Sequence, residues 1–525
     1  MAIFFLLFVF ASIGVSTAQA QETEKDYKLL WSYETGNILE DISVSTDGSY
    51  IAAGSRDNKV YFFNLNGELL WSYKTGGSVW GVSVSSDGSY IAAGSYDYNV
   101  YLFNQEGKLL WKYKTDGVVR DVSVSSDGSY IAAGSGEEMG ITGLYYGNNN
   151  VYLFNREGEL LWSYKTDSEV GGVSISSDSL YIAAGSGDYK VYFFNLNGKL
   201  LWNYKTDSTV YGVSVSSDGS YIAAGSCDYK AYFFNRKGEL LWSYKTDSDV
   251  SSVSISSDGS YIAAGSGYDK IYLFNRERKV LWSYSYQPTY KKTTRVEGVS
   301  ISSDGSYIAA VFCSGKVCFF ITLERLAKDN IEKAKMAVDS EGGKGFNIAE
   351  AETLLSQAEQ AFKAGDYTQA NYFADQAKAK AEAIGREAIE AKSTIHKAMS
   401  AISQEKSKGF ILTEADSLFS QSEKVFNAGD YNKVKELADE SYSLAIDIDQ
   451  DEVINENDFA PTIKNNYIYA GGVVLTAVFT GAGFVFSRNR KKRKEYQAKV
   501  REYRAKMEQW KSEGYDVSGL EEMMK

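Results

Sequence analysis

Histidine and cysteine are scarce in this chain of 525 residues, which has one histidine, His396, and three cysteines, Cys227, Cys313 and Cys318. Three cysteines make no disulfide framework, although Cys313 and Cys318 could pair across a hairpin. His396 lies outside the repeated region described below. That region therefore has no histidine-based catalytic triad and no zinc cluster.

The first twenty residues carry no charge. They contain an apolar run followed by small residues that end in Ala18-Gln19-Ala20, and no Lys or Arg precedes the run. This pattern is typical of a secretory signal cleaved before Gln21, even without basic residues at its start. We therefore interpret residues 1–20 as a signal peptide.

A second uncharged run, residues 467–486, is twenty residues long and as a helix would span about 30 Å of hydrocarbon. Basic residues follow it directly: Arg488, Arg490, Lys491, Lys492, Arg493 and Lys494. Such residues stay on the cytoplasmic side, so we predict a single-pass helix in the cell membrane with residues 487–525 as a cytoplasmic tail. The alternative, a buried core helix, fits poorly with this basic cluster.

Charge is divided unevenly between the two sides of the predicted membrane. The chain has a net charge of −13, and residues 488–525, with 12 basic and 7 acidic residues, have +5, so residues 21–487 carry −18. An acidic outer part argues against nucleic acid and against anionic lipid as partners. The basic cluster could touch anionic headgroups, as stop-transfer sequences commonly do.

One phrase, SSDGSYIAAGS, is written four times, at residues 85–95, 125–135, 216–226 and 256–266. Three looser copies lie at residues 45–55, 176–186 and 302–312. The motif LLWSY recurs with it and places tryptophans at Trp31, Trp71, Trp111, Trp162, Trp202, Trp242 and Trp282. A period near 40 residues, with alternating apolar residues and Asp-Gly turns, is typical of a β-propeller in which each repeat forms one blade.

One copy shows how the repeat forms a blade. Val82–Ser85 alternates as an inner strand, Asp87-Gly88 makes a tight turn, and three more strands are expected at residues 90–94, 100–103 and 109–113. The chain begins with an unpartnered LLWSY, and its last repeat has three strands and no fourth. The first segment can complete the last blade, so we predict a closed seven-bladed propeller over residues 26–322.

The repeat resembles two propeller families. Gly67-Glu68-Leu69-Leu70-Trp71 resembles the repeat of quinoprotein-type (PQQ-like) propellers, and SSDGSYIAAGS is similar to WD repeats. The resemblance covers roughly 295 residues and implies a fold more strongly than an activity. Quinoprotein dehydrogenases typically have eight blades, a calcium site and two adjacent cysteines, and this sequence departs from all three. We therefore expect no cofactor and no enzymatic activity, and we interpret the recurring Trp as core packing.

Two insertions and one ring of positions distinguish the copies. The insertions, Gly136–Asn150 and Ser285–Arg295, are eleven and six residues longer than their counterparts and are expected on the face opposite the Asp-Gly turns. The residue two before each inner strand also varies, and we expect these residues in loops around the mouth of the central channel: Glu40, Trp80, Arg120, Gly171, Tyr211, Ser251 and Glu297. Trp, Tyr and Arg are enriched at binding hot spots. The predicted ligand-binding residues are Glu40, Trp80, Arg120, Tyr211 and Glu297 from the ring and Tyr145, Tyr146 and Tyr290 from the insertions.

Two alternatives remain open for this ring. Drift at solvent-exposed loop positions would explain the variation of any one residue. Glu40 and Glu297 come from blades that are adjacent across the closure, so a carboxylate pair for glycoside hydrolysis is conceivable. Nothing in the sequence sets their separation or raises the pKa of either carboxyl group.

Residues 323–448 are rich in Ala, Lys, Glu and Gln with helical periodicity, and they contain a second repeat with a period of 64 residues. Its Ala-Gly-Asp-Tyr corners, at residues 364–367 and 428–431, resemble those of tetratricopeptide repeats, although that repeat is shorter. We expect antiparallel helical hairpins that form a stalk or docking module. An acidic, unpatterned linker, residues 449–466, joins them to the membrane helix.

The tail holds a short apolar seam at coiled-coil spacing, made by Tyr496, Val500, Tyr503, Met507 and Trp510. Ala477 and Gly481 have the spacing that lets membrane helices approach each other. A homodimer through the membrane helix and tail is therefore an alternative to a monomer.

Together these patterns predict an all-β seven-bladed β-propeller, an all-α helical-hairpin region and one transmembrane helix. We expect a non-catalytic binding or scaffold module at the cell surface that binds a protein or a glycan and no nucleic acid. The alternatives are a transmembrane signal receptor that acts through its cytoplasmic tail, and a quinoprotein-type or glycan-acting enzyme. The layout resembles that of archaeal surface proteins.

Overall fold

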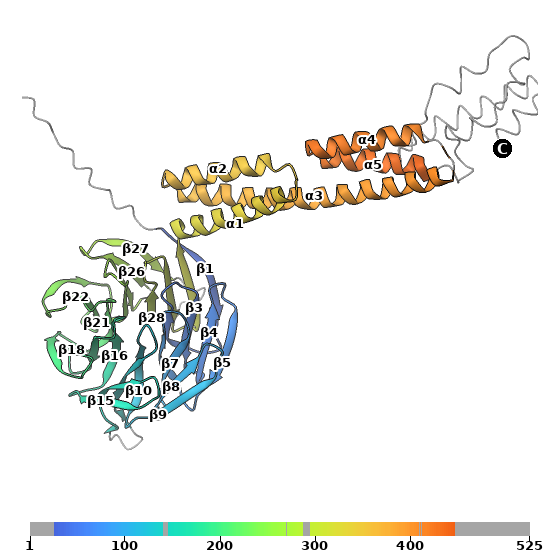
Figure 1. The fold of residues 1–525 in the computed structure, drawn as a ribbon. Helices are drawn as coiled ribbons and strands as arrows, with labels where there is room; N and C mark the ends of the chain where they lie inside the picture. The colour runs from blue at the N-terminus through green and yellow to red at the C-terminus, as the bar shows by residue number, and fades with distance from the viewer. Residues whose placement is uncertain are drawn as a thin grey trace, which may run out of the picture. The chain divides into compact units, whose positions relative to one another are not determined.

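The computed structural model divides the chain into two compact units, one that ends at Leu326 and one that begins at Ala327 (Figure 1). The residues that it describes are 26–139, 145–268, 270–286, 295–408, 410 and 412–446. The predicted signal peptide, linker, membrane helix and cytoplasmic tail lie outside these residues. Among the helices of the described residues, none is long and apolar enough to cross a membrane.

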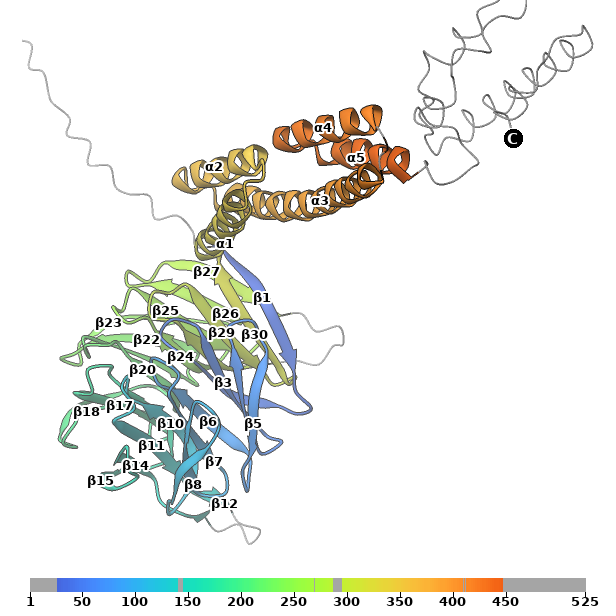
Figure 2. The same cartoon turned by 45° about the vertical axis from the view of Figure 1, so that its right-hand side comes forward.

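The first unit is a seven-bladed β-propeller in which each blade is a four-stranded antiparallel sheet (Figure 2). From inner to outer strand, blades 1 to 3 are β2 (Leu39–Val44), β3 (Tyr50–Ser55), β4 (Lys59–Asn64), β5 (Leu69–Lys74); β6 (Val79–Val84), β7 (Tyr90–Ser95), β8 (Asn99–Asn104), β9 (Leu109–Lys114); and β10 (Val118–Val124), β11 (Tyr130–Gly136), β14 (Asn150–Asn155), β15 (Leu160–Lys165). A two-stranded hairpin, β12 (Glu138–Met139) and β13 (Tyr145–Tyr146), lies in the insertion of blade 3.

The remaining blades follow the same order from the channel outward. Blades 4 to 6 are β16 (Val170–Ile175), β17 (Tyr181–Ser186), β18 (Lys190–Asn195), β19 (Leu200–Lys205); β20 (Val210–Val215), β21 (Tyr221–Ser226), β22 (Lys230–Asn235), β23 (Leu240–Lys245); and β24 (Val250–Ile255), β25 (Tyr261–Ser266), β26 (Lys270–Asn275), β27 (Val280–Ser285). Blade 7 is β28 (Val296–Ile301), β29 (Tyr307–Phe312), β30 (Lys316–Thr322) and β1 (Tyr27–Glu34).

Blade 7 closes the ring with strands from both ends of the propeller. Its outer strand, β1, pairs antiparallel with β30, so the first LLWSY completes the last repeat as the sequence predicts. The Tyr27 ring lies 4.9 Å from the Trp282 ring between centroids, and its hydroxyl donates to the Gly305 carbonyl oxygen. These contacts bind the first strand to both blade 6 and blade 7.

The recurring Trp of each outer strand joins its blade to the next one. The Trp31 indole Nε1 donates to the Leu65 carbonyl oxygen at 2.8 Å, and five more tryptophans make the equivalent bond at 2.7–2.9 Å. In the same turn, Gly67 has a φ of 80°, and a Cβ there would lie 2.7 Å from the Trp31 ring. The Gly of the Gly-x-x-x-Trp motif therefore packs against the Trp of the preceding blade.

A serine in each inner strand joins the blades around the channel. Its hydroxyl oxygen accepts a hydrogen bond of 3.0–3.1 Å from a backbone N–H of the next blade, and the bond from blade 7 to blade 1 closes the circle. The pairs are Ser43–Val84, Ser83–Val124, Ser123–Ile175, Ser174–Val215, Ser214–Ile255, Ser254–Ile301 and Ser300–Val44. This circle satisfies inner-strand donors that face away from their own sheet.

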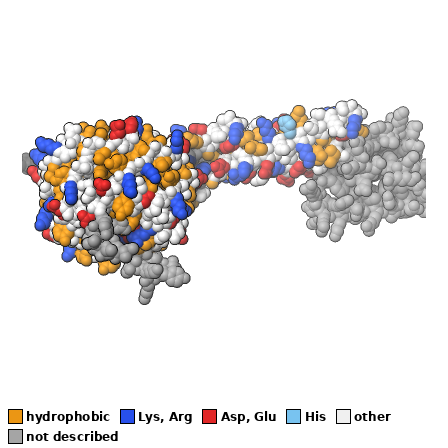
Figure 3. Space-filling model, turned by 90° about the horizontal axis from the view of Figure 1, so that it is seen from below, with side chains coloured by type: hydrophobic (Ala, Val, Ile, Leu, Met, Phe, Trp, Pro, Cys, Tyr) orange, Lys and Arg blue, Asp and Glu red, His pale blue; other side chains and the backbone are white. Residues whose placement is uncertain are grey.

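The outer strands present apolar side chains to solvent. Leucines of the LLWSY motif are about 40–47% exposed in six blades, at Leu29, Leu30, Leu69, Leu70, Leu110, Leu160, Leu161, Leu201, Leu240 and Leu241. Figure 3 shows hydrophobic side chains at the propeller surface among charged and neutral polar ones. In blade 6 the equivalent Leu281 is 5% exposed and belongs to a core cluster that Tyr27 also contacts.

The helical region contains two hairpins that share one long helix. Its helices are α1 (Leu323–Gly343), α2 (Ala349–Lys363), α3 (Tyr367–Ser407), α4 (Thr413–Ala428) and α5 (Tyr431–Ile446). The α3 helix has 41 residues, so it supplies an arm to each copy of the 64-residue repeat. Alanines fill the contacts between helices, because their small side chains allow close approach: Ala334, Ala358, Ala374, Ala377, Ala381, Ala388 and Ala391 are fully buried.

The Ala-Gly-Asp-Tyr corners begin helices and connect the two hairpins. Asp366 accepts a bond from the Gln369 backbone N–H at 3.0 Å, which caps α3, and Asp430 caps α5 in the same way. The Tyr431 hydroxyl accepts a bond of 3.0 Å from the Asn347 backbone N–H. The second corner therefore packs against the loop of the first hairpin.

Cys313 and Cys318, which could pair across a hairpin, form no disulfide in the structure. The hairpin of β29 and β30 pairs Phe312 with Lys316, which leaves Cys313 in the turn and places Cys318 opposite Ala310. The two cysteines are therefore not cross-strand neighbours. Burial raises the pKa of the Cys318 thiol to about 11.

Candidate functional site

The varied ring residues lie inside the inner strands, and the prediction that they lie in loops was wrong. Six of them are the second residue of their strand, as Glu40 is in β2 and Trp80 is in β6, and Arg120 is the third residue of β10. The reason is a local break in the strand pattern. The alternation of apolar and polar residues in each inner strand becomes regular only after the varied residue. A prediction from that alternation alone therefore starts the strand too late and leaves the varied residue in the preceding loop.

Each varied residue is the extra residue of a β-bulge. In blade 1, Leu39 pairs with Ser55 and Asp41 pairs with Gly54, so Glu40 between them has no partner across the ladder. The same shift occurs in every blade. We call these residues the bulge ring: Glu40, Trp80, Arg120, Gly171, Tyr211, Ser251 and Glu297. Bulges re-aim side chains and are common beside binding sites, which gives this set of varied positions a shared structural cause.

A bulge residue lies against the residue that follows AAGS in its own blade. The rings of Trp80 and Tyr96 are 5.5 Å apart between centroids. The Tyr211 hydroxyl is hydrogen-bonded to the Cys227 thiol, and this bond, together with burial, raises the pKa of Tyr211 to about 12. The sequence reasoning missed this second position. Its signal is visible in the sequence, because the residue after AAGS also varies, between Arg, Tyr, Gly and Cys.

Arg120 forms no ion pair with any acidic side chain that the structure describes. Its guanidinium carbon lies 5.0 Å from the centre of the Trp80 ring, a cation–π contact between neighbouring blades. Its Nε is buried and has no hydrogen-bond partner within the described residues. A Cβ at Gly136 would lie 2.6 Å from this Nε, so the first insertion begins beside Arg120. Within the described residues, the charge of Arg120 is therefore not balanced by a carboxylate.

Tyr211 and Glu297 belong to a second cluster, centred on Arg295. The Arg295 guanidinium carbon lies 5.5 Å from the centre of the Tyr211 ring. One of its terminal nitrogens lies 3.0 Å from Asp249 Oδ2, and its Nε lies 3.4 Å from Glu297 Oε2. Because Arg295 is the last residue of the second insertion, that insertion returns to the bulge ring at this point. Here the cation is balanced by carboxylates, unlike Arg120.

The two glutamates of the ring are close enough to interact electrostatically. Burial raises the pKa of Glu297 to about 7, against the lowering effect of Arg295, and the charge of Glu40 raises it further. Glu40 forms an ion pair with Arg56, the residue after AAGS in blade 1. A carboxyl group with a raised pKa near a second carboxylate is the arrangement that the glycosidase alternative requires.

The tyrosines predicted in the insertions are only partly covered by the structure. Tyr145 and Tyr146 form β13, which pairs with Met139 and Glu138 of β12. Their side chains and the whole of Tyr290 lie outside the described residues. Among the residues that are described, no three carboxylate, thiol or imidazole side chains gather as metal ligands.

Asp41 and Asp121, each next to a bulge residue, were also missed. Asp41 Oδ2 accepts a bond from Val82 N at 2.8 Å, and Asp121 Oδ2 accepts one from Val173 N at 2.7 Å. Burial raises the pKa of Asp41 to about 7 and the pKa of Asp121 well above its usual range. Each aspartate therefore ties its blade to the next one. The sequence signal is that this position is Gly or Ser elsewhere: Gly81, Gly172, Gly212, Ser252 and Gly298.

Four tyrosines in the turns beside the bulge ring have a left-handed backbone conformation: Tyr268, with a φ of 62°, and three that share one turn position. Tyr98, Tyr189 and Tyr229 have φ values of 69°, 72° and 68°. Asn58 occupies the same turn position in blade 1 and Gly315 in blade 7, with φ values of 70° and 83°. This conformation costs an ordinary L-residue about 1 kcal/mol, and Gly and Asn adopt it most readily. The sequence reasoning missed these tyrosines, because a backbone angle leaves no periodic pattern.

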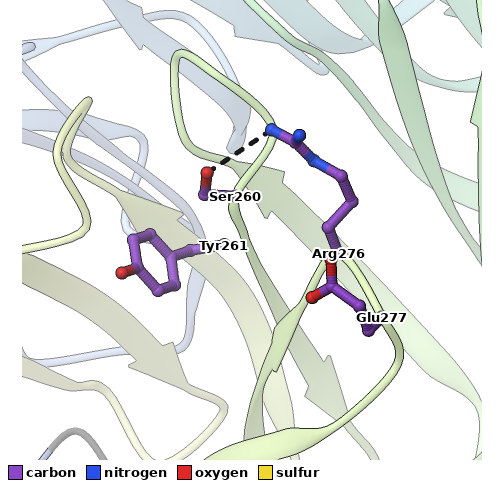
Figure 4. A pocket seen from close by; sticks show the side chains of 4 residues that line it. All are labelled: Ser260, Tyr261, Arg276 and Glu277. Carbon is purple, nitrogen blue, oxygen red and sulfur yellow. Dashed lines mark hydrogen bonds between the residues drawn. The ribbon is translucent and has the colours of Figure 1, made fainter. Parts of the chain in front are cut away.

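The opposite face, where the Asp-Gly turns lie, holds a small pocket lined by Ser260, Tyr261, Arg276 and Glu277 (Figure 4). Arg276 reaches across it and donates to the Ser260 hydroxyl at 3.4 Å (Figure 4). Arg156 and Arg236 donate to the equivalent serines, Ser129 and Ser220, at 3.2 Å. The Arg–Ser contact of the pocket therefore recurs in three blades.

Comparison with known families gives one similarity. Residues 13–137 and 133–268 match the model of a family of unknown function, DUF5711. No curated protein matches the chain. The matched residues reach from before β1 into blade 6, and the description of the family assigns no activity to them.

Proposed function

We propose that this protein is a membrane-anchored binding module, with an extracellular propeller that binds a protein or glycan ligand over the bulge ring. The observation that carries the proposal is the set of seven bulges in otherwise near-identical blades. Selection for the fold alone would keep these seven positions as similar as the rest of the repeat. The bulge residues have no partner residue on the neighbouring strand, and their variation fits a surface selected for a ligand.

The bulge ring offers two kinds of contact to such a ligand. Trp80 and Arg120 present an aromatic ring and a guanidinium group that has no acidic partner among the described side chains. The cluster of Glu40, Glu297 and Asp249 presents carboxylates. Trp, Tyr and Arg at the centre of a contact surface commonly supply most of its binding energy. A preformed stack of Trp80 and Arg120 loses little entropy on binding.

A binding assay on cell envelopes tests the proposal. The full-length protein in detergent is mixed with envelopes of the source organism that are untreated, protease-treated or periodate-oxidised, and retention is measured. We expect the W80A/R120A variant to bind at least about tenfold more weakly than the wild type. The matched control is R236A, because Arg236 stacks on Tyr181 at the same distance of 5.0 Å on the opposite face. Equal retention of the ring variant, or loss of retention in R236A alone, would contradict the proposal.

The extracellular placement has its own test. A protease added to intact cells should release the propeller and spare an epitope placed at Lys525, because the positive-inside rule keeps the basic tail in the cytoplasm. Loss of the epitope, with the propeller protected, would mean that the orientation is reversed.

Glycoside hydrolysis is a second candidate, favoured by the raised pKa of Glu297 beside Glu40. In this reading Glu297 is the general acid and Glu40 the second carboxylate. Release of reducing sugar from an envelope polysaccharide, lost in E297Q and retained in R236A, would support it. An E297Q variant that binds normally, with no hydrolysis by the wild type, would leave binding as the function.

A further inference from the structure

We infer that the bulge-ring face binds a neutral polysaccharide through the tyrosines of three turns, Tyr98, Tyr189 and Tyr229. We call these residues the turn tyrosines. The inference rests on the proposed function, because it assumes that the ligand docks on this face. It adds the class of ligand and a set of contact residues outside the bulge ring.

The turn tyrosines lie on the bulge-ring face. Each follows by two positions the residue after AAGS, and that residue contacts the bulge ring, as Arg56 contacts Glu40 and Tyr96 contacts Trp80. The turns between β3 and β4 and between their equivalents therefore border the ring.

The backbone of these turns is held in the left-handed conformation whatever the side chain is. The Thr206 N–H and hydroxyl both donate to the Tyr189 carbonyl oxygen, at 2.8 and 2.9 Å. Thr246 makes the same two bonds to Tyr229, at 2.8 and 3.0 Å. Asn58 and Gly315 have matching bonds from a threonine. Asn or Gly fits this turn with less strain than tyrosine does. The stability of the turn therefore does not explain why three blades have tyrosine at this position.

Two of the turn tyrosines are well exposed, at 43% for Tyr189 and 47% for Tyr229. An exposed phenol presents an apolar ring face and a hydroxyl group, which match the C–H face and the hydroxyls of a sugar. The residue that follows each of these two tyrosines is a lysine in an ion pair. Lys190 Nζ lies 3.0 Å from Asp167 Oδ2, and Lys230 Nζ lies 2.8 Å from Asp207 Oδ2. These groups can hydrogen-bond sugar hydroxyls beside the stacked ring.

The two sets are copies of each other on adjacent blades. Blade 4 presents Tyr189 with its Lys–Asp pair, and blade 5 presents Tyr229 with an equivalent pair. Two equal subsites suit a ligand whose own chemistry repeats, as that of a polysaccharide does. Residues 21–487 carry a net charge of −18, so a neutral chain is favoured over a polyanion.

Affinity electrophoresis of the full-length protein in detergent tests the inference. Native gels contain hydroxyethylcellulose, mannan, or the polyanion polygalacturonate as a charged comparison. We expect a neutral polysaccharide to retard the wild type, and Y189N/Y229N to bind it at least tenfold more weakly. The same variant should melt at a higher temperature than the wild type, because Asn relieves the left-handed strain. Y189F/Y229F should retain most of the binding, since the ring face is kept.

The matched control is N58G, a change at the same turn position of blade 1 that removes no aromatic ring. It should leave binding unchanged. If Y189N/Y229N binds the polysaccharide as well as the wild type does, the inference is overturned, whatever happens to the melting temperature. If the wild type binds polygalacturonate more strongly than either neutral polysaccharide, the inference that the ligand is neutral is overturned.

The W80A/R120A variant separates this inference from the proposed function. If no neutral polysaccharide retards the wild type, but its retention on periodate-oxidised envelopes still requires Trp80 and Arg120, the ligand is a protein; the inference then fails and the proposed function stands. If the ring variant and the tyrosine variant both bind every probe and every envelope like the wild type, both fail.

Discussion

The two faces of the propeller are built from the same repeats and are used in different ways. On the turn face, the Asp-Gly turns and the tryptophans repeat the same bonds in most blades, and an arginine repeats one contact in three blades. On the bulge-ring face, the bulge residue varies, and only blades 1 and 7 share one, a glutamate. One face holds the blades together, and the other differs from blade to blade. Variation between the repeats of such a protein therefore points to function only at positions whose side chains are not needed for the bonds that join the repeats.

The aspartates near the two faces also titrate in opposite directions. On the turn face, the Ser89 hydroxyl donates to Asp87 at 2.6 Å and holds the pKa of Asp87 below its usual value. Beside the bulge ring, burial raises the pKa of Asp41 to about 7. Exposed turn carboxylates that accept hydrogen bonds favour the charged form, whereas a buried carboxyl group favours the neutral one.

We expect the largest effect from opening the closed ring of blades, on which both faces depend. Deleting residues 21–35 takes away β1 and leaves β30 as an open edge. We expect the melting temperature to fall by more than about 10 °C and the protein to associate through that edge. Calorimetry and size-exclusion chromatography measure the two effects. An unchanged melting temperature in a monomeric product would show that β1 does not complete blade 7.

A substitution on the turn face should cost stability and leave binding unchanged. Gly107 has a φ of 79°, and a Cβ there would lie 2.8 Å from the Trp71 ring. We expect G107A to lower the free energy of unfolding by about 3 kcal/mol, measured by urea denaturation. G36A is the control, because a Cβ at Gly36 would meet nothing within 4 Å. Equal stability of the two variants would mean that the turn-face packing is looser than the structure indicates.

The pH dependence of stability should separate the two faces. The raised pKa of Asp41 means that the folded protein holds this proton more tightly than the unfolded chain does. Its contribution is therefore greatest below the usual pKa of an aspartate, and stability falls as pH rises to about 7. Asp87, with its lowered pKa, contributes above its usual pKa and loses that contribution in acid. Stability should therefore be greatest near pH 4, the usual pKa of an aspartate, and to an order of magnitude about 2 kcal/mol lower at pH 8.

D41N tests which group causes the alkaline side of this profile. The variant should lose less stability than the wild type between pH 5 and pH 8, because Asn carries no charge to bury. Asp121 and Glu297, whose pKa values are also raised, should cause the remaining fall. A D41N profile that overlays the wild-type profile would assign the effect to those two groups alone.

The smallest expected effect concerns pairing on the bulge-ring face. Trp80 and Tyr96 are in ring contact, so a double-mutant cycle of W80A and Y96A should give a coupling of about 1 kcal/mol in the free energy of unfolding. Trp80 and Tyr211, which lie in blades 2 and 5, should give additive effects. Coupling of equal size in both cycles would mean that the ring responds as a whole.

Much of the fold could be predicted from residues close together in the sequence. The Asp87-Gly88 turn, the alternation after Val82 and the spacing of Gly67 and Trp71 each report local geometry, and repetition made them reliable. The predicted site was less complete. The ring positions were found because they vary, but their place inside the strands was not, since a bulge exists only when two strands are paired.

The sequence by itself determined the number of blades, the closure by the first LLWSY and the helical hairpins, because periodicity and turn residues act over short stretches of chain. Only the tertiary structure decided which side chains meet across blades: Arg120 on Trp80, Arg295 on Tyr211, and Glu297 near Glu40. It also decided the left-handed turns of Tyr189 and Tyr229 and the burial that raises the pKa of Asp41. These features depend on distances between strands that are far apart in the chain, and such distances exist only once the ring has closed.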